Sequence, residues 1–155
     1  MNTIFFSYSH RDEELRNELE IHLQALQRQG LIETWHDRRI AAGDDVHHSI
    51  SAQLETASII LLLVSPYFIA SDYCYDVEMK RALELNSAKQ TRVIPVILEP
   101  CVWHDLPFGG LLATPTDGKP VSKHANIHDA FVDIVNAIRD ALPEEAELWL
   151  KVVYG

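Results

Sequence analysis

Short, uninterrupted apolar runs alternate along the chain with longer stretches of helical periodicity. Residues 4–6, 59–64 and 93–98 form such runs, and a weaker one covers residues 31–35. A continuous apolar run is typical of a strand buried on both faces, and strands separated by helices form parallel sheets. The alternation therefore predicts an α/β fold in which helices cover both faces of a parallel sheet. We expect five strands in a doubly wound arrangement, with ligand at the carboxyl ends of the strands.

Four helices are expected between and after these strands. Ser9 or Asp12 caps the first, which ends at Gly30. Asn126 caps the last, and Pro143 ends it. Their apolar faces are formed by Leu15, Leu19, Leu23 and Leu26; by Val46, Ile50, Leu54 and Ala57; by the stretch 73–85; and by Phe131, Ile134 or Val135, Ile138 and Leu142.

The third of the strong apolar runs contains a proline, Pro95. A proline removes one donor from the ladder of hydrogen bonds in a sheet. The strand beside it is therefore expected to be short and to cover only Pro120–Ser122. The segment 101–119 is rich in glycine and proline and is predicted to be a long loop with at most one helical turn.

The charge balance excludes several classes of partner. Acidic residues outnumber basic ones by 23 to 13, so the formal net charge is −10. That field repels nucleic acid and anionic membranes, and neither is expected as a partner. Cys74 and Cys101 form neither a CxxC pair nor a disulfide framework, which fits a reducing compartment. With no apolar run near the ~20 residues of a membrane span and no basic leader segment, a cytoplasmic protein is expected.

One domain is predicted over residues 1–143, and a tail over 144–155. The tail is too apolar for a solvated segment. It is interpreted either as the start of a linker or further element in a longer protein, or as a last helical turn that folds back on the core.

Two loops carry side chains suited to an anionic ligand. Residues 7–12 lead into a helix N-terminus, where free N–H groups favour an anion, although a simple capping loop explains them equally well. Residues 35–43 place Arg38 and Arg39 on the loop after the second strand. Guanidinium groups suit phosphate oxygens, but on charge alone a solvated loop is the simpler interpretation.

A third segment carries an acid that could take part in catalysis. Glu78 lies one turn into the helix that opens near Ser71, and an acidic residue is also common there for electrostatic reasons alone. Cys74 lies four residues earlier, on the same face, and a cysteine in that place usually packs. No metal site is expected, because His47 and His48 are adjacent and the other histidines lack zinc-site spacing. The chain contains no GxSxG motif and nothing that suggests a Ser-His-Asp triad.

Taken together, these segments resemble Toll/interleukin-1 receptor (TIR) domains of the bacterial type. The resemblance covers residues 3 to about 142. It is carried jointly by Ile4-Phe5-Phe6-Ser7-Tyr8-Ser9 with Asp12, Trp35-His36-Asp37 with Gly43, Leu62–Ser65 with Pro66, Ser71-Asp72-Tyr73-Cys74 with Glu78, Val93-Ile94-Pro95-Val96-Ile97, and Trp103. It implies a flavodoxin-like, five-stranded parallel sheet in the order 2-1-3-4-5, with helices on both faces.

The resemblance also implies two kinds of function. Some TIR domains cleave NAD at the nicotinamide–ribose bond, and their catalytic glutamate falls here on Glu78. Many relatives place that glutamate three residues after a Trp-Cys pair, whereas Glu78 lies four residues after the cysteine of Tyr73-Cys74. Asp76 therefore remains a second candidate. NAD is implied as substrate, with no further cofactor and with contacts from Tyr8, Ser9, His10, Arg39, Gly43, Cys74 and Trp103.

Other TIR domains are non-catalytic scaffolds that assemble through the loop after the second strand, here residues 36–45. The expected function is an NAD glycohydrolase that forms ADP-ribose, a cyclic isomer or both. By resemblance it is a prokaryotic immune effector activated by self-assembly and by a separate sensor. A TIR–TIR scaffold is the alternative. A nucleoside deoxyribosyltransferase-like enzyme is a weaker one, because the segments 35–43 and 71–74 favour the TIR family.

Overall fold

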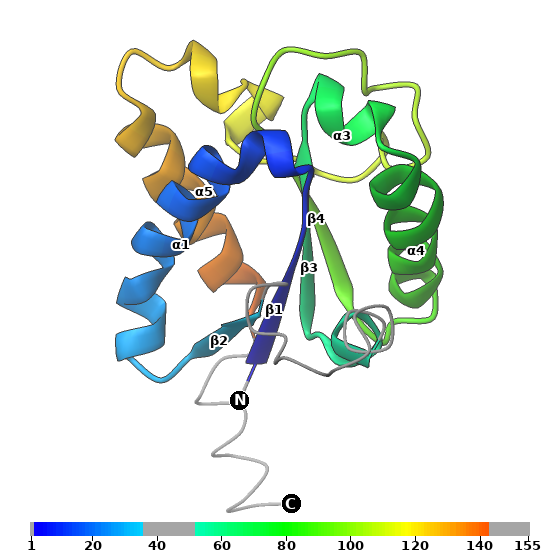
Figure 1. The fold of residues 1–155 in the computed structure, drawn as a ribbon. Helices are drawn as coiled ribbons and strands as arrows, with labels where there is room; N and C mark the ends of the chain where they lie inside the picture. The colour runs from blue at the N-terminus through cyan, green and yellow to red at the C-terminus, as the bar shows by residue number, and fades with distance from the viewer. Residues whose placement is uncertain (1, 36–51, 143–155) are drawn as a thin grey trace, which may run out of the picture.

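The computed structural model describes residues 2–35 and 52–142, and a parallel sheet lies at its centre (Figure 1). In these residues the sheet has four strands: β1 (Asn2–Ser7), β2 (Ile32–Trp35), β3 (Ile59–Val64) and β4 (Arg92–Ile97). Their order is β2-β1-β3-β4, and every neighbouring pair is parallel. The predicted α/β fold with a doubly wound parallel sheet is confirmed.

The burial of the central strand β3 explains why its sequence is continuously apolar. All of its side chains are buried. Leu61 and Leu63 pack into a core cluster with residues of α1 and α5, whereas Leu62 and Val64 pack into a second cluster with residues of the opposite helices. Successive side chains of a strand point to opposite faces of the sheet. When both faces are buried, no position along the strand favours a polar side chain.

Helices cover both faces of the sheet, as expected (Figure 1). α1 (Glu13–Arg28) and α5 (Ile127–Ala141) lie on one face, and α3 (Pro66–Ala70), the π-helix η3 (Tyr73–Met79) and α4 (Lys80–Ser87) lie on the other. The predicted cap of the last helix is present, since the Asn126 side chain accepts the His128 N–H at 2.9 Å. Short 3-10 turns occur at η1 (His10–Asp12), η4 (Thr116–Gly118) and η5 (Val121–Lys123).

The fifth strand predicted at Pro120–Ser122 is wrong, because this segment runs into the 3-10 turn η5. Among the described residues, the outer edge of β4 is met by a single bridge, from Thr114 to Val96. The Thr114 N–H donates to the Pro95 carbonyl, and the Ile97 N–H donates to the Thr114 carbonyl, both at 2.9 Å. The backbone of Pro95 therefore faces this edge, and its missing N–H removes a donor where a fifth strand would pair.

The region after β3 also differs from the single helix predicted over 73–85. The short helix α3 comes first, with Pro66 in its first turn and the Ser65 hydroxyl accepting the Phe68 N–H at 3.1 Å. Residues 73–79 then form a π-helix, and regular α-helix begins only at Lys80. The long loop predicted over 101–119 is confirmed, with the turn η4 near its end.

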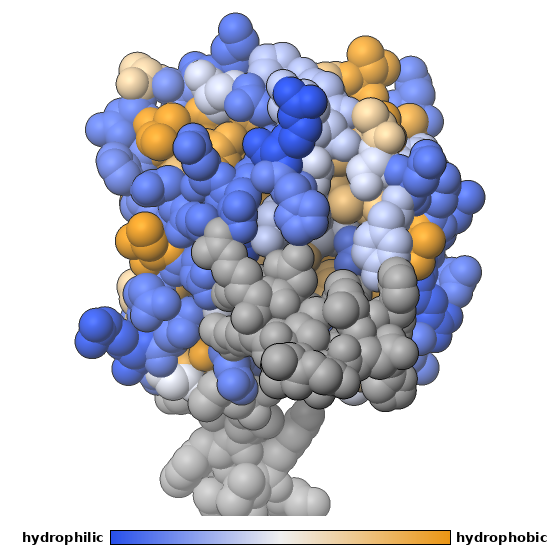
Figure 2. Space-filling model, viewed as in Figure 1, coloured by the Kyte–Doolittle hydropathy of each residue, from blue (hydrophilic) through white to orange (hydrophobic). Residues whose placement is uncertain are grey.

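Several predictions fall outside the described residues. Of the second predicted helix, residues 52–56 are described and are helical. The loop 36–45, Pro143 and the predicted tail 144–155 are not among the described residues. Within the described ranges, no helix has the length and apolar character needed to cross a bilayer. Outside its grey atoms, the face in Figure 2 is mostly hydrophilic, with its apolar residues in separate small patches.

Candidate functional site

Buried polar side chains gather where β1 and β3 end side by side. We call Ser7, Asp12, Ser65, Cys74 and Glu78 the carboxyl-edge cluster. β1 ends at Ser7, and β3 runs beside it, with Ser65 directly after its last residue. The order of the strands reverses at this pair, and in open parallel sheets the crevice at such a reversal is where ligands bind. The cluster therefore lies where the sequence predicted a ligand.

Glu78 is the acid of this cluster that the sequence singled out. Glu78 belongs to the π-helix η3, which packs against one face of the sheet, and it is only 6% exposed. The hydroxyl of Ser7 donates a hydrogen bond to Glu78 Oε1 at 2.9 Å. A buried carboxylate costs free energy unless hydrogen bonds compensate for its lost hydration, and such groups are frequent at functional sites.

Asp76, the second candidate acid, lies in a different environment. Its side chain is 54% exposed, and its carboxylate pairs with the Lys80 ammonium at 3.7 Å on the outer face of the helix. An exposed pair of this kind is solvated and contributes little. The π-helical turn thus carries one buried acid, Glu78, and one exposed acid, Asp76.

A second carboxylate in the cluster belongs to Asp12. The Ser65 hydroxyl donates to Asp12 Oδ2 and also accepts the Phe68 N–H, which caps α3. Burial raises the pKa of Asp12 above its ordinary value, and the charge of Glu99 adds to this rise. The hydrogen bond from Ser65 and the charge of Arg11 act in the opposite direction. The Ser65–Asp12 contact ties the loop after β1 to the start of α3.

Cys74 joins the loop after β1 to the π-helix. Its thiol donates to the Tyr8 carbonyl at 3.3 Å, and its backbone N–H donates to Ser71 Oγ at 3.2 Å. Burial is the main cause that raises the pKa of the thiol to about 11, and the negative charges of Glu78 and Asp12 add to it. Cys74 is therefore a protonated packing residue at neutral pH, because the thiolate is the reactive form.

The three loop residues expected to contact NAD lie in different places. The Tyr8 carbonyl faces Cys74, whereas its ring packs on the α1–α5 side of the sheet, 5.8 Å from the Arg16 guanidinium. Ser9 accepts the Arg11 N–H at 3.3 Å and so caps η1. His10 is exposed and stands edge-on to the Tyr8 ring at 6.3 Å. Two of these residues bond to the cluster through their backbone: the Tyr8 carbonyl accepts from the Cys74 thiol, and the Ser9 carbonyl accepts the Asp12 N–H at 2.8 Å.

Trp103 anchors the long loop after β4. Its side chain is 7% exposed, packs into the core cluster on the α4 side and stacks on His104, with the ring centroids 3.9 Å apart. Arg39 and Gly43, the other two residues expected to contact NAD, lie outside the described residues.

The sequence placed Ser7 and Asp12 in a candidate anion-binding loop without predicting their contacts, and it assigned no site role to Ser65. A signal for Ser7 was present, because alternation along β1 puts it on the same face as Phe5, which packs on the α4 side. The contacts of Asp12 and Ser65 span 53 positions and leave no periodic signal. In the described part of the chain, no group of three or more His, Cys, Asp or Glu side chains is placed to hold a metal ion.

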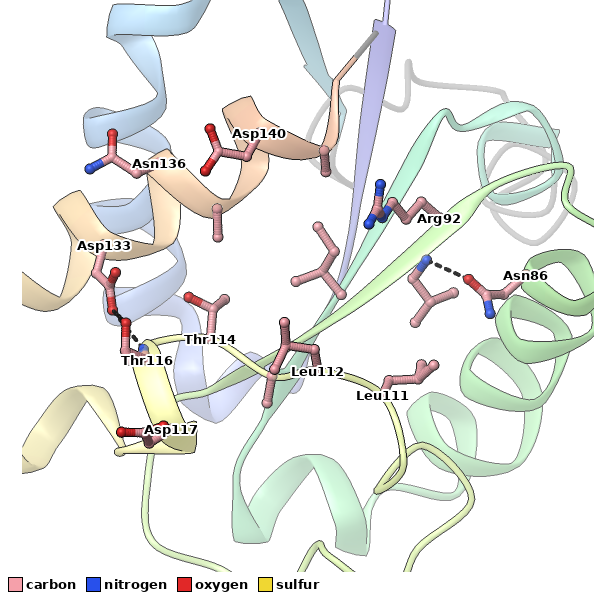
Figure 3. A pocket seen from close by; sticks show the side chains of 15 residues that line it. Asn86, Arg92, Leu111, Leu112, Thr114, Thr116, Asp117, Asp133, Asn136 and Asp140 are labelled. Atoms are coloured by element: carbon pink, nitrogen blue, oxygen red, sulfur yellow. Dashed lines mark hydrogen bonds between the residues drawn. The ribbon is translucent and has the colours of Figure 1, made fainter.

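A separate groove of about 560 Å³ lies along the outer edge of β4 (Figure 3). β4, the loop around Thr114 and the helix α5 form its walls. The backbone N–H and the hydroxyl of Thr116 donate to Asp133 at 2.6 and 2.8 Å, which joins the loop to α5. No member of the carboxyl-edge cluster lines this groove.

Comparisons with known proteins agree with this architecture. Residues 4–117 match a family model described as a TIR domain. The uncharacterized protein y4lF of Sinorhizobium fredii is 55% identical over 141 residues, which are 91% of this chain and 44% of that protein. The chain thus spans less than half the length of this relative.

A solved structure shares the fold. It is the crystal structure of the TIR domain of the Toll-related receptor TRR-2 from Hydra magnipapillata. The match has a TM-score of 0.64 and 20% sequence identity, and it covers 89% of this chain and 96% of that one. Since the family model matches most of the chain and the fold agrees with a solved TIR domain, this chain belongs to the TIR domain family.

Proposed function

We propose that this TIR domain is an NAD glycohydrolase, with Glu78 as its catalytic residue. The observation that carries the proposal is the burial of the Glu78 carboxylate at the carboxyl edge of the sheet, where it accepts a hydrogen bond from Ser7. Burying an acid costs free energy of folding, and this acid is buried at the place where parallel sheets bind ligands. The π-helical backbone beneath Glu78 adds support, because π-helical turns are frequent at functional sites.

One carboxylate is sufficient for this chemistry. The bond between ribose C1′ and the nicotinamide nitrogen breaks, and its electron pair leaves with nicotinamide, which departs as a neutral molecule. No general acid is needed, in contrast to glycosidases whose leaving group is an alkoxide. The oxocarbenium-like ribose carries the positive charge, and an anionic Glu78 near it lowers the energy of the transition state. Water then adds to C1′ and releases a proton, which gives ADP-ribose.

The other expected contacts complete the proposed site. Tyr8, Ser9 and His10, from the loop after β1, are proposed to contact the dinucleotide, and Arg39 and Gly43 are proposed as further contacts because the family resemblance implies them. Cys74 is proposed to line the site beside Glu78 as a neutral thiol, and Trp103, which is 7% exposed, is proposed as a further contact. Attack on C1′ by the adenine ring in place of water yields a cyclic isomer, so both products share the first step.

Activity is proposed to depend on self-assembly and on a separate sensor. The relative from Sinorhizobium fredii is more than twice as long as the matched region, which leaves room for a further module there. We propose that such a module, in the same chain or in a partner, clusters the domain when triggered, as in a prokaryotic immune effector. Clustering acts by mass action, so dilute protein is expected to be less active than concentrated protein.

Asp76 provides a matched control for the test of this proposal. Concentrated wild-type protein, with and without a crowding agent, is incubated with NAD, and nicotinamide release is followed by chromatography. Glu78→Gln is expected to abolish release, whereas Asp76→Asn removes an exposed acid two residues earlier and is expected to retain it. Equal rates for wild type and Glu78→Gln refute the assignment, and loss in Asp76→Asn alone moves it to Asp76.

A TIR–TIR scaffold is the second candidate function. It is favoured by the outer edge of β4, which meets one bridge within residues 2–35 and 52–142 and lies beside a groove. If the domain is a scaffold alone, clustered protein releases no nicotinamide. Substitution of Arg39 or Gly43 then abolishes self-association, measured by light scattering.

A further inference from the structure

Ser7 holds the Glu78 carboxylate from the opposite side of the cluster. It is the last residue of β1, is fully buried, and pairs with Leu62 of the neighbouring strand β3. Its hydroxyl donates to Glu78 Oε1 at 2.9 Å across 71 positions of the chain. The serine Oγ is placed by a single side-chain torsion. A side chain on a central strand is also held more precisely than one on a loop.

We infer that Ser7 is a positioning residue for the proposed reaction, because it orients Glu78 and supports its negative charge. This inference rests on the proposed NAD glycohydrolase activity. A hydrogen bond to a charged acceptor is stronger than one between neutral groups. By holding Oε1, Ser7 fixes the plane of the carboxylate before the positive charge develops on ribose, and such preorganisation lowers the barrier rather than improving substrate binding.

The titratable groups near Glu78 on the described elements include Tyr73 and Cys74. Tyr73 and Cys74 belong to its own helix, and Glu78 contributes to the raised pKa of each, after the larger effect of burial. Asp12, from the loop after β1, is a further acid acting on Cys74. Ser7 donates a hydrogen bond to the carboxylate at 2.9 Å, so its removal is expected to change the orientation and the charge stabilisation of Glu78 directly.

The test compares Ser7→Ala with Ser58→Ala in concentrated protein. Ser58 Oγ accepts the Thr3 N–H at 3.2 Å, so the control removes a serine hydroxyl that contacts the other end of the same strand. Ser7→Ala is expected to lower kcat for nicotinamide release by roughly 10- to 100-fold, while KM for NAD changes less than about threefold. Ser58→Ala is expected to leave both constants near those of the wild type.

A pH profile separates positioning from a merely structural role. Loss of a hydrogen bond to the charged form raises the pKa of a carboxyl group. The acid limb of kcat is therefore expected to move to higher pH in Ser7→Ala and to stay in place in Ser58→Ala. If Ser7→Ala does not fold, Ser7→Cys, with a weak donor of similar size, supplies the same comparison.

Each outcome is decisive. Wild-type protein that releases no nicotinamide under clustering overturns the proposed function and this inference with it. Active wild type with an unchanged kcat and acid limb in Ser7→Ala overturns the inference alone. A rise in KM with unchanged kcat also overturns it, because that pattern indicates lost binding of the ground state rather than lost positioning.

Discussion

Replacing Ser65 by alanine tests the contact that ties the two loops of the site together. The hydroxyl has two roles: it donates to the buried carboxylate of Asp12, and it accepts the Phe68 N–H at the start of α3. Loss of the cap costs about 1 kcal/mol. Loss of a hydrogen bond to a buried charged group costs about 1.5–3 kcal/mol. Ser65→Ala is therefore expected to reduce the free energy of unfolding by roughly 2.5–4 kcal/mol at neutral pH, a fall in Tm of about 5–15 °C.

The loss is expected to depend on pH, because Asp12 is ionisable. Burial raises the folded-state pKa of Asp12 above its ordinary value of 3.8, and the Ser65 hydrogen bond opposes this rise. Between 3.8 and the folded-state pKa the native protein binds more protons than the unfolded chain, so this group stabilises the fold less as pH rises. Removing Ser65 raises the folded-state pKa further. The effect of Ser65→Ala is thus largest at neutral pH and shrinks in acid.

Urea unfolding at about pH 7.5 and at about pH 4 measures this difference as the change in midpoint at constant m-value. Ser71→Ala is the matched control, because Ser71 Oγ accepts the Cys74 N–H at 3.2 Å. It is expected to cost about 1 kcal/mol at both pH values. An equal loss for Ser65→Ala at both pH values, or a loss no larger than that of Ser71→Ala, refutes the reasoning.

Three further predictions concern residues away from Glu78. Arg16 is buried and forms an ion pair with Glu20 one turn later in α1, while its Nε and Nη2 atoms have no hydrogen-bond partner among the described residues; replacing this ion pair by Arg16→Met with Glu20→Gln is expected to leave Tm unchanged or higher, and a fall of more than about 10 °C contradicts this. With a thiol pKa of about 11, Cys74 is expected to resist alkylation by iodoacetamide at neutral pH in folded protein, and rapid labelling found by mass spectrometry would disprove its assignment as a neutral packing residue. Gly118 has a φ of 69°, and a Cβ there would lie 2.8 Å from the Trp103 ring; Gly118→Ala is expected to destabilise the fold by roughly 1–3 kcal/mol and to shift tryptophan fluorescence, whereas Gly110→Ala has open space and is expected to do neither.

The strands and long helices were predictable because their burial leaves a periodic record. β3 was predicted with its observed bounds, since a strand with two buried faces must be apolar throughout. The cap at Asn126 was predictable because the interaction is local. The absence of a strand at 120–122 was not predictable. The backbone of Pro95 faces the outer edge of β4 and has no N–H to donate there, and the sequence does not show which way a backbone faces.

The candidate site was predictable only in part, for a related reason. Glu78 and Cys74 could be placed on one helix face by their spacing, and both are buried in the cluster. The partners of these groups, Ser7 for Glu78 and the Tyr8 carbonyl for Cys74, come from a strand end more than sixty positions away. Such pairs depend on how the chain folds, so neither composition nor periodicity reveals them.

The central claim is that the buried carboxylate of Glu78 drives cleavage of NAD. Its most direct test is the rate of nicotinamide release per molecule of protein, measured over a range of protein concentrations for wild type and Glu78→Gln. The account predicts a wild-type rate that rises with concentration as the domains assemble, and a Glu78→Gln rate at least about 100-fold lower at every concentration. Release that is absent from wild type at the highest concentration, or that is the same in both proteins, would contradict it.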